Sequence, residues 1–423
     1  MRAYIKINKC RICNSKKIIE VFDLKKQYIQ GSFIKKHYPK PYQKKIPLKL
    51  VLCKNCGLLQ TQHTTDKSKL YKNYWYMSQI NSTMRNHLKE IALSLNKINN
   101  DKNLSVLDIG CNDGTLLNYF PKNIKKYGID PSDLVKKIKS KKIKIIKDFF
   151  PIRKVNIEKL NTKFDFITSI AMFYDIHRPN YFVKNIKKYL KKKGIWVFEL
   201  SYLADMLKLR SFDTICHEHL EYYSLSTLNY LMKKNNLKIF KILRNKINGG
   251  SIRCYVTHRN NKTFDNQNEN LKIKNTITNE KKQKLLSAST YREFYQKSLT
   301  IKNKINKLFD TIKKNKKKIY ILGASTKGNT ILQFLNIEKN FIKFAVERNK
   351  EKIGAYIIGT NIKIISENSV KKNYPDYYLV LPWHFKKEII NREKVYIKNG
   401  GSLIFPLPRV HIINKDNYKK YVK

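Results

Sequence analysis

The sequence predicts an α/β fold in which a doubly wound, Rossmann-like parallel sheet is joined to a small metal-binding domain. Apolar strands alternate with glycine turns and amphipathic helices through the middle of the chain, and another strand, glycine turn and helix follow near the C-terminus. Two Cys-x-x-Cys pairs lie near the N-terminus. With 423 residues, the chain exceeds what one hydrophobic core usually organises, so we expect several domains.

The N-terminal domain, expected at residues 1–70, is predicted from its cysteines. Four of the seven cysteines form two pairs, Cys10 with Cys13 and Cys53 with Cys56. Two residues between cysteines let both thiolates of a tight turn face one ion, and two such turns complete a tetrahedral shell. Four sulfur ligands leave no open position, so we expect a structural zinc ion. The alternative is two unrelated redox or buried pairs.

The central domain, expected at residues 71–260, is predicted from a series of apolar strands. They are expected at 105–110, 126–130, 142–150, 164–173 and 194–202. A glycine-containing turn, CNDG, opens a helix after the first strand, and YFVKNIKKYLKKKG is predicted to form an amphipathic helix that ends at Gly194. This repetition of strand, turn and helix is typical of a doubly wound parallel sheet.

A cofactor site is predicted at the turn after the first strand. Ligands bind beyond the carboxyl ends of the strands in such a sheet, and Gly110 and Gly114 would let a cofactor approach the backbone closely. Asp130 ends the second strand, where a carboxylate can accept the hydroxyls of a ribose. The turn G-C-N-D-G lacks the third glycine of a dinucleotide fingerprint. It therefore favours S-adenosylmethionine over NAD, because a sulfonium and an amino-acid end need no pyrophosphate cradle.

The adenine of this cofactor is expected beside the third strand. Asp148 and Phe149 follow that strand and would hold the adenine amine and cover its ring. The complete set of expected cofactor contacts is Asp108, Gly110, Asn112, Asp113, Gly114, Asp130, Asp148, Phe149 and Ser169. The alternative is a glycine turn that follows a strand for folding alone.

The segment CHEHLEYYSL, residues 216–225, places two imidazoles and a carboxylate at consecutive positions, His217, Glu218 and His219. The pKa of histidine lies nearest neutrality, and a neighbouring carboxylate can orient an imidazole, so this segment predicts proton-transfer chemistry. The alternatives are a pair of zinc ligands and a histidine that only satisfies a loop.

The C-terminal third is predicted to hold a helical linker at 261–316 and a second Rossmann-like domain at 317–410. Ser325, Lys327 and Asn329 follow a strand at the start of a helix, where an anion such as a pyrophosphate is favoured; a turn kept only for folding is the alternative. Residues 411–423 are expected to form a basic tail.

The formal net charge of +57 would ordinarily suggest nucleic acid or a membrane as partner. The lysines are spread over every segment together with Ile and Asn, so we interpret them as solvated surface that reflects genome composition. The opening residues do not resemble a signal peptide and no stretch approaches the length of a membrane span. We expect a cytoplasmic monomer with neither a nucleic-acid nor a membrane partner.

Seven motifs in order resemble one known family along almost the whole chain. After the cysteine pairs they are DIGCNDGTLL (108–117), TSIAMFYD (168–175), CHEHLEYYSL (216–225), GGSIRCYV (249–256), GASTKGNT (323–330) and LPWHF (381–385). They are similar to the three-domain sugar C-methyltransferases of deoxysugar biosynthesis. The resemblance implies a zinc domain, a class I methyltransferase sheet and a C-terminal Rossmann-like domain. It also implies S-adenosylmethionine-dependent methylation of a carbon next to a keto group on a nucleotide-linked deoxysugar.

The resemblance also assigns roles to individual residues. His219 matches the family's general base, Glu218 its acidic neighbour at the sugar, and Tyr76 a tyrosine that enters the active site. The family often has tyrosine in place of Cys216 and histidine in place of Asp175, so these two departures leave the sugar undefined. Together with Tyr222, they complete the expected sugar pocket.

Removing a proton next to a ketone leaves negative charge on the ketone oxygen, and either Tyr76 or His217 could donate a hydrogen bond to that oxygen.

Two alternatives from other functional classes are a zinc-containing RNA methyltransferase and a non-catalytic scaffold that retains the fold. The segment IAMFYD stands where enzymes that methylate base nitrogens usually carry a proline-rich acidic or polar tetrapeptide, which disfavours the first. The intact histidine cluster disfavours the second.

Overall fold

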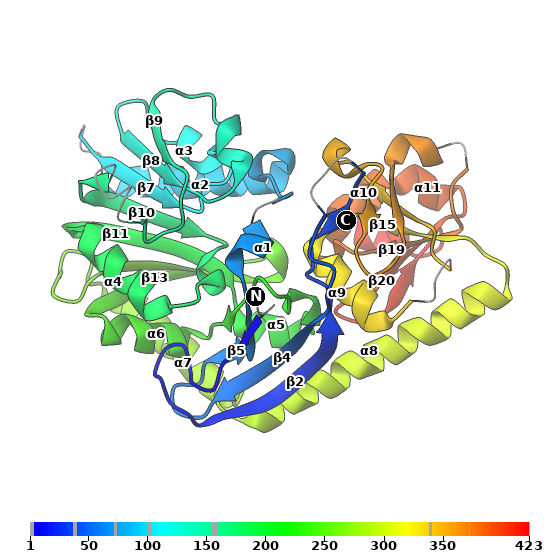
Figure 1. Ribbon diagram of the computed structural model, residues 1–423, viewed down its shortest axis with the longest axis horizontal. Helices are drawn as coiled ribbons and strands as arrows, with labels where there is room; N and C mark the ends of the chain where they lie inside the picture. Colours follow the sequence, from blue (N-terminus) through cyan, green and yellow to red (C-terminus); the bar gives the residue numbers. More distant parts are fainter. Residues whose placement is uncertain are drawn as a thin grey trace.

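The protein is described by a computed structural model that covers residues 4–36, 40–71, 74–99, 103–153, 160–337, 341–371 and 373–422. Its strands form four sheets in these ranges. The central and C-terminal sheets lie on opposite sides of the molecule, and the N-terminal strands and one long helix run beneath both (Figure 1).

The N-terminal sheet has the order β12-β5-β4-β2. Its strands are β2 (Ile18–Gln27), β4 (Ile46–Cys53), β5 (Leu59–Thr61) and β12 (Glu221–Tyr222). A separate pair is formed by β1 (Tyr4–Lys6) and β6 (His63–Thr65), and helix α1 (Lys67–Tyr71) follows. Strand β12 comes from the CHEHLEYYSL segment, so the histidines lie directly beside the metal-binding domain.

The central sheet has seven strands in the order β13-β14-β11-β10-β7-β8-β9. They are β7 (Ser105–Ile109), β8 (Lys125–Ile129), β9 (Ile143–Ile146), β10 (Phe164–Ile170), β11 (Leu190–Ser201), β13 (Leu237–Asn245) and β14 (Ser251–His258). The first five in sequence are parallel, and β14 runs antiparallel to both of its neighbours. This arrangement confirms the predicted doubly wound α/β sheet.

The helices of the central domain differ from the prediction at one boundary. They are α2 (Ser82–Ile98), α3 (Thr115–Asn118), α4 (Pro179–Tyr189), α5 (Leu203–Lys208) and α6 (Leu225–Lys234). Helix α4 ends at Tyr189 instead of Gly194, because Leu190 already pairs with Phe164 of β10. A Cβ on Gly194 would lie 2.9 Å from the Phe164 carbonyl oxygen, so this glycine permits the close pairing of β11 with β10.

The predicted linker consists of helices α7 (Gln267–Lys282) and α8 (Ala288–Lys314). Helix α8 has 27 residues and runs from the N-terminal sheet to the C-terminal domain (Figure 1). Its buried side chains Phe294, Ile301, Ile305 and Ile312 belong to a core that includes both of those regions. No helix in the described ranges is long and apolar enough to cross a membrane.

The C-terminal sheet has eight strands in the order β21-β20-β19-β15-β16-β18-β17-β3. They are β3 (Phe33–Ile34), β15 (Ile319–Leu322), β16 (Phe344–Glu347), β17 (Tyr356–Ile357), β18 (Lys363–Ser366), β19 (Tyr377–Val380), β20 (Ser402–Phe405) and β21 (His411–Ile413). The helices are α9 (Thr326–Leu335), α10 (Lys386–Arg392) and α11 (Lys394–Lys398). Strands β15, β16, β18, β19 and β20 are parallel, which is the predicted second Rossmann-like unit.

Both edges of this sheet depart from the sequence-based expectation. Strand β3 reaches across from the N-terminal domain and pairs with β17. At the other edge, part of the expected basic tail is strand β21, which pairs antiparallel with β20. Ile413 is fully buried. Burial of this apolar side chain stabilises the segment in the fold, whereas a solvated polar tail would gain no such stabilisation.

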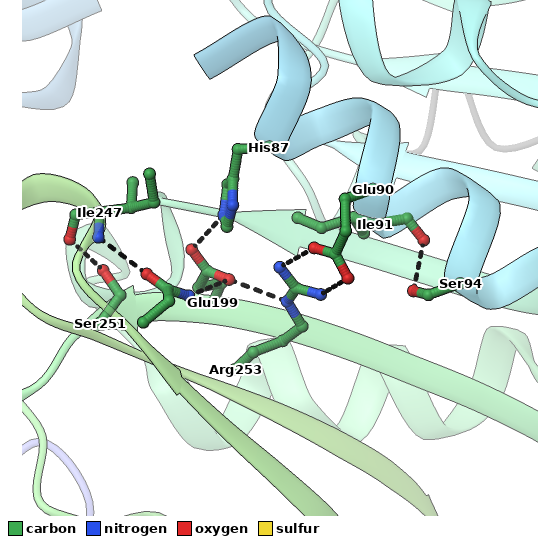
Figure 2. Close-up of polar contacts among 9 residues, drawn as sticks. His87, Glu90, Ile91, Ser94, Glu199, Ile247, Ser251 and Arg253 are labelled. Atoms are coloured by element: carbon green, nitrogen blue, oxygen red, sulfur yellow. Dashed lines mark hydrogen bonds and ion pairs between the residues drawn. The ribbon is translucent and has the colours of Figure 1, made fainter. Parts of the chain in front are cut away.

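A network of charged side chains joins α2 to the edge of the central sheet (Figure 2). Glu199 at the end of β11 contacts His87 Nε2 at 2.6 Å and Arg253 Nε at 2.9 Å. Arg253 also binds Glu90 through both terminal nitrogens, at 3.1 and 2.8 Å. Because Glu199 and Arg253 are almost fully buried, each depends on the other to balance its charge.

Replacing Arg253 with Met should therefore destabilise the protein strongly, because Glu199 would keep a buried charge with only His87 and an amide as partners. Breaking a buried pair on one side typically costs about 3 to 5 kcal/mol. The midpoint of urea unfolding measures the change. The matched control is Glu90→Gln: the Glu90 side chain is 53% exposed, so its loss should cost less than about 1 kcal/mol. Equal midpoints for the two variants would contradict this account.

Candidate active site and zinc centre

The four paired cysteines converge on one point. Cys10 Sγ lies 3.5 Å from Cys56 Sγ, Cys13 Sγ lies 3.5 Å from Cys53 Sγ, and all four sulfurs lie within 4.8 Å of one another. A tetrahedral shell with sulfur about 2.3 Å from zinc places neighbouring sulfurs about 3.8 Å apart. The cluster therefore fits one zinc ion and offers it no open position.

The local backbone explains why these turns gather their sulfurs. Asn14 N donates to the Cys10 carbonyl oxygen and Gly57 N to the Cys53 carbonyl oxygen, each at 3.0 Å. Asn14 and Gly57 have φ angles of 61° and 75°, a left-handed conformation that asparagine and glycine adopt most easily. The residue after each Cys-x-x-Cys pair thus closes the turn.

A cavity of about 630 Å³ opens at the carboxyl ends of the central strands. Its walls include the strand ends and their loops, side chains of α1 and of residues 74–78, the first part of α2, and the start of α9 with the LPWHF motif. This cavity therefore lies where the doubly wound fold predicts a ligand.

The cofactor loop has the conformation that the sequence predicts. Gly110 has φ 76°, and a Cβ there would lie 3.0 Å from Met172 Cγ, so only glycine leaves this wall open. Asp130 lines the cavity and accepts from Asn112 N at 2.9 Å on Oδ2, while Ser132 occupies Oδ1. Because Oδ2 has a single donor, it can still accept a ribose hydroxyl. This geometry fits S-adenosylmethionine.

Two further carboxylates line the same cavity. Asp108 accepts from Thr168 Oγ1 at 2.7 Å, and burial raises its pKa to about 7. Asp148 accepts from Phe149 N at 2.9 Å and from Arg153 Nε at 3.1 Å. The Lys67 ammonium lies over the Phe149 ring, 3.8 Å from the centroid of the ring. Helix α1 therefore covers the part of the cavity where the adenine of the cofactor is expected.

Three of the expected cofactor contacts have structural roles, and two of them lie outside the cavity wall. Asn112 accepts from Ser78 N at 3.2 Å and also lines the cavity. Asp113 is absent from the cavity wall; it accepts from Thr115 N at 3.2 Å at the start of α3 and from Gln79 N at 3.0 Å. Gly114, with φ 75°, is the N-cap of the same helix and likewise lies outside the wall. These residues hold the segment that carries Tyr76 against the loop.

Ser169 is a correction to the expected cofactor set. Its hydroxyl accepts from the Trp196 indole N–H at 3.2 Å and does not line the cavity. Side chains alternate along a strand, so Ser169 faces the covering helix layer whereas Ile170 reaches the cavity.

The two histidines of CHEHLEYYSL face different surroundings. His219 lines the cavity, and its Nδ1 lies 2.7 Å from the Thr214 carbonyl oxygen. That carbonyl can only accept, so Nδ1 carries the hydrogen and Nε2 is left as a free base. Desolvation, and then the positive charge of Lys327, lowers the pKa of His219 to about 3. A neutral imidazole is therefore available throughout the physiological range.

His217 is a correction, because it lies outside the cavity wall. Its Nδ1 lies 2.7 Å from Gln30 Oε1 and its Nε2 lies 3.2 Å from the Ile46 carbonyl oxygen, both in the N-terminal domain. The two imidazoles do not converge, which excludes a zinc site that uses both. It also removes His217 as a donor to substrate.

The expected sugar pocket is assembled in part. Glu218 and Asp175 line the cavity, and desolvation raises the pKa of Glu218 to about 7. Asp175 Oδ1 is buried without a hydrogen-bond partner among the described residues. Cys216 is buried behind them, with its sulfur within 4.8 Å of the ligand atoms of Glu218 and His219. Tyr222 lies outside the wall and donates to the His219 carbonyl oxygen at 3.2 Å.

At the C-terminal side, Ser325 and Lys327 line the cavity and Asn329 does not. Ser325 is the N-cap of α9 and accepts from Gly328 N at 3.0 Å. Asn329 is buried and accepts from Gln333 at 2.9 Å, so it stabilises the helix interior. Tyr76, 47% exposed, lines the mouth of the cavity.

Other cavity residues escaped the sequence analysis. Tyr71, Tyr74, Tyr174, Asn248 and His384 all line the wall. The cluster of tyrosines in YKNYWYM and the histidine of LPWHF were the available signals. Neither signal identifies a cavity residue from sequence alone, because the sequence does not show which distant segments lie together in the fold.

Replacing Asp130 with Ala should weaken S-adenosylmethionine binding, because the variant loses the acceptor at the end of β8. Loss of a charged hydrogen-bond partner costs about 1.5 to 3 kcal/mol, or roughly ten- to a hundredfold in affinity. Calorimetry measures the change. Asp133→Ala is the matched control, since this neighbouring side chain is 59% exposed and pairs only with surface lysines. Unchanged affinity in Asp130→Ala would place the cofactor elsewhere.

Comparisons with known proteins agree with this geometry. Residues 76–242 match a methyltransferase domain family, residues 10–71 a zinc binding domain family, and residues 246–408 the C-methyltransferase C-terminal domain family. C-methyltransferase NovU from Streptomyces niveus is 25% identical over 420 residues, which are 97% of this chain and 98% of NovU.

Solved structures give weaker overall matches. A S-adenosylmethionine-dependent methyltransferase from Clostridium acetobutylicum has 13% identity and a TM-score of 0.33, covering 41% of this chain and 92% of its own. The plantazolicin methyltransferase BpumL has 15% identity and a TM-score of 0.34, covering 43% and 87%.

The sheet, the cofactor cavity and the matched domains define an S-adenosylmethionine-dependent methyltransferase with a structural zinc site. The order of the three domains makes the assignment more specific. The chain is an S-adenosylmethionine-dependent C-methyltransferase, and it is similar along its length to the three-domain, zinc-containing C-methyltransferase NovU.

Proposed function

We propose that this enzyme methylates a carbon next to the ketone of a nucleotide-linked keto-deoxysugar, with His219 as the general base. The observation that carries the proposal is the position of His219. Its free Nε2 belongs to a cavity that extends from the cofactor loop to the C-terminal domain, and the Thr214 carbonyl fixes its tautomer.

The chemistry requires these residue types. Bound S-adenosylmethionine would supply an electrophilic methyl group, but a sugar carbon becomes nucleophilic only after it loses a proton. A neighbouring ketone makes this loss feasible because the charge moves onto oxygen. The neutral His219 imidazole can take that proton, and the Glu218 carboxyl next to it can bind a sugar hydroxyl.

The nucleotide end is proposed to lie toward α9. Ser325 and the first turn of this ten-residue helix face the cavity, and free N–H groups at a helix start favour phosphate oxygens. The excess of lysine over the chain adds a general attraction for an anionic substrate.

A mass-spectrometric screen tests the proposal. Purified enzyme with S-adenosylmethionine should add one methyl group to at least one keto-sugar nucleotide, and the corresponding sugar reduced to an alcohol should stay unmodified. Methylation of RNA in place of any sugar would overturn the substrate class. Failure to bind S-adenosylmethionine by calorimetry would favour a scaffold without catalysis.

A further inference from the structure

We propose that Lys327 is a catalytic residue that donates a hydrogen bond from its ammonium group to the enolate oxygen formed during proton removal. This inference rests on the proposed function and identifies the donor that proton removal next to a ketone requires. Lys327 and Ser325 then have different roles: Lys327 binds the ketone oxygen, and Ser325 binds the phosphates of the nucleotide.

The ammonium group of Lys327 has unused donors at the cavity wall. Lys327 Nζ donates to the Asn248 carbonyl oxygen at 2.8 Å. Lysine has three N–H donors, and no other acceptor for Lys327 is found among the described residues. The side chain lines the same cavity as His219, so two donors remain for a ligand there.

The charges around Lys327 place it close to the base. Desolvation is the main cause that lowers the pKa of both His219 and His384, and the positive charge of Lys327 is the second cause for each. Burial lowers the pKa of Lys327, and the nearby Asp213 and Cys216 oppose that lowering and so favour the charged ammonium. An ammonium that shares the cavity wall with His219 and His384 suits an oxygen that gains charge when His219 gains a proton.

The two donors that the sequence suggested are less well placed. His217 lies outside the cavity, bound to the N-terminal domain. Tyr76 is 47% exposed, and among the described residues no hydrogen bond fixes its hydroxyl. A donor fixed in a wall that excludes water stabilises a developing charge more than a mobile one does.

The network of Figure 2 holds Ile247, the residue before Asn248. Asn248 lies in the short turn η6 (Ile247–Gly249) between β13 and β14. Ile247 N donates to Asn245 Oδ1 at 2.9 Å, and Asn245 Nδ2 donates to Glu199 Oε2 at 3.0 Å. The buried carboxylate thus anchors the turn whose carbonyl orients Lys327.

The C-terminal domain fixes the other side of this turn. A Cβ on Gly249 would lie 3.5 Å from Trp383, and the Trp383 indole N–H donates to Asp213 Oδ2 at 2.8 Å. Lys327, which lies in α9 of the C-terminal domain, is therefore bonded to a turn of the central domain that both domains hold in place.

The step balances as follows. His219 Nε2 takes the proton from the carbon, the C–H pair becomes the C=C bond, and the C=O π pair moves to the oxygen that Lys327 contacts. The carbon then bonds to the methyl group, the C–S pair leaves on sulfur, and the ketone re-forms. His219 releases its proton to solvent.

The first test needs no substrate. Imidazole resonances followed by ¹H–¹⁵N NMR give the pKa of His219, assigned by its loss in His219→Asn. Lys327→Met should raise this pKa toward the ordinary histidine value, and Lys327→Arg should leave it low. Lys352→Met is the matched control: this lysine also binds a backbone carbonyl in the C-terminal domain, at 2.7 Å from Ala324 O, but lies outside the cavity. An unchanged His219 pKa in Lys327→Met would overturn the proposed proximity.

The second test uses thymidine diphosphate-4-keto-6-deoxyglucose in heavy water with S-adenosylhomocysteine. Lys327→Met should slow this deuterium exchange, and in a separate assay with S-adenosylmethionine it should lower kcat by about 10² to 10³, the usual effect of losing one oxyanion donor. KM should change little, and the acid limb of the kcat/KM profile should move to higher pH because the His219 pKa has risen. A raised KM with normal kcat and exchange would make Lys327 a phosphate anchor and overturn the proposal. Absence of exchange in the wild-type enzyme would instead count against the proposed function itself.

Discussion

His219→Asn is expected to abolish methylation while leaving S-adenosylmethionine affinity unchanged. The asparagine amide has a similar shape but cannot accept the proton, so a general-base contribution of about 10² to 10⁴ should be lost. Deuterium exchange into the keto sugar should disappear together with methyl transfer, since proton removal comes first. Mass spectrometry measures both, and calorimetry shows whether the cofactor still binds.

His217→Asn separates the base from its neighbour. His217 contacts Gln30 and Ile46 and not the cavity, so this variant should retain exchange even if the protein is less stable. If His217→Asn loses exchange and His219→Asn retains it, the two roles are reversed. If both retain it, the base lies elsewhere in the cavity wall, with Tyr76 as the next residue to replace.

Cys53→Ser is expected to remove zinc and to destabilise the N-terminal domain. Metal binding at a four-sulfur site contributes directly to folding, so losing one ligand should release the ion and lower the unfolding temperature. Activity should fall as well, because α1 and the tyrosines that follow it form one wall of the cavity. Elemental analysis of the purified variant measures the zinc.

Cys254→Ser provides the matched control for this prediction. Cys254 is fully buried in β14 and lies far along the chain from the metal cluster, so its replacement should alter packing but keep one zinc per chain. Correctly folded wild-type protein without zinc would contradict the metal assignment. A Cys53→Ser variant with normal zinc content would contradict the ligand set.

The parts of the fold that depend on neighbouring residues could be predicted from sequence. Strand β7, the left-handed Gly110 and Asp130 at the end of β8 follow from one apolar run, one glycine turn and one carboxylate at a typical spacing. The zinc ligands were predictable for the same reason, since two short turns carry all four sulfurs. The α/β fold class, the C-methyltransferase class and the cofactors are confirmed.

The orientation of individual side chains could not be predicted in the same way. His217 and His219 are two positions apart, and only the tertiary structure turns one toward β4 and the other toward the cavity. Tyr71 and His384 reach the cavity from distant segments, so nothing near the cofactor motif indicates them. Strands β3 and β12 are two residues long and pair with strands far away in the chain, which no local periodicity reveals.

The pairing of β3 with β17 limits how this enzyme can be recombined with its relatives. Two residues of the N-terminal domain, Phe33 and Ile34, complete the edge of the C-terminal sheet. Gly31 just before them packs so tightly that a Cβ would lie 2.4 Å from the Thr326 hydroxyl at the start of α9. A chimera that exchanges only the C-terminal domain would leave β17 as an open sheet edge, which invites aggregation. Transplanting substrate specificity therefore requires moving the 31–34 segment together with the domain it completes.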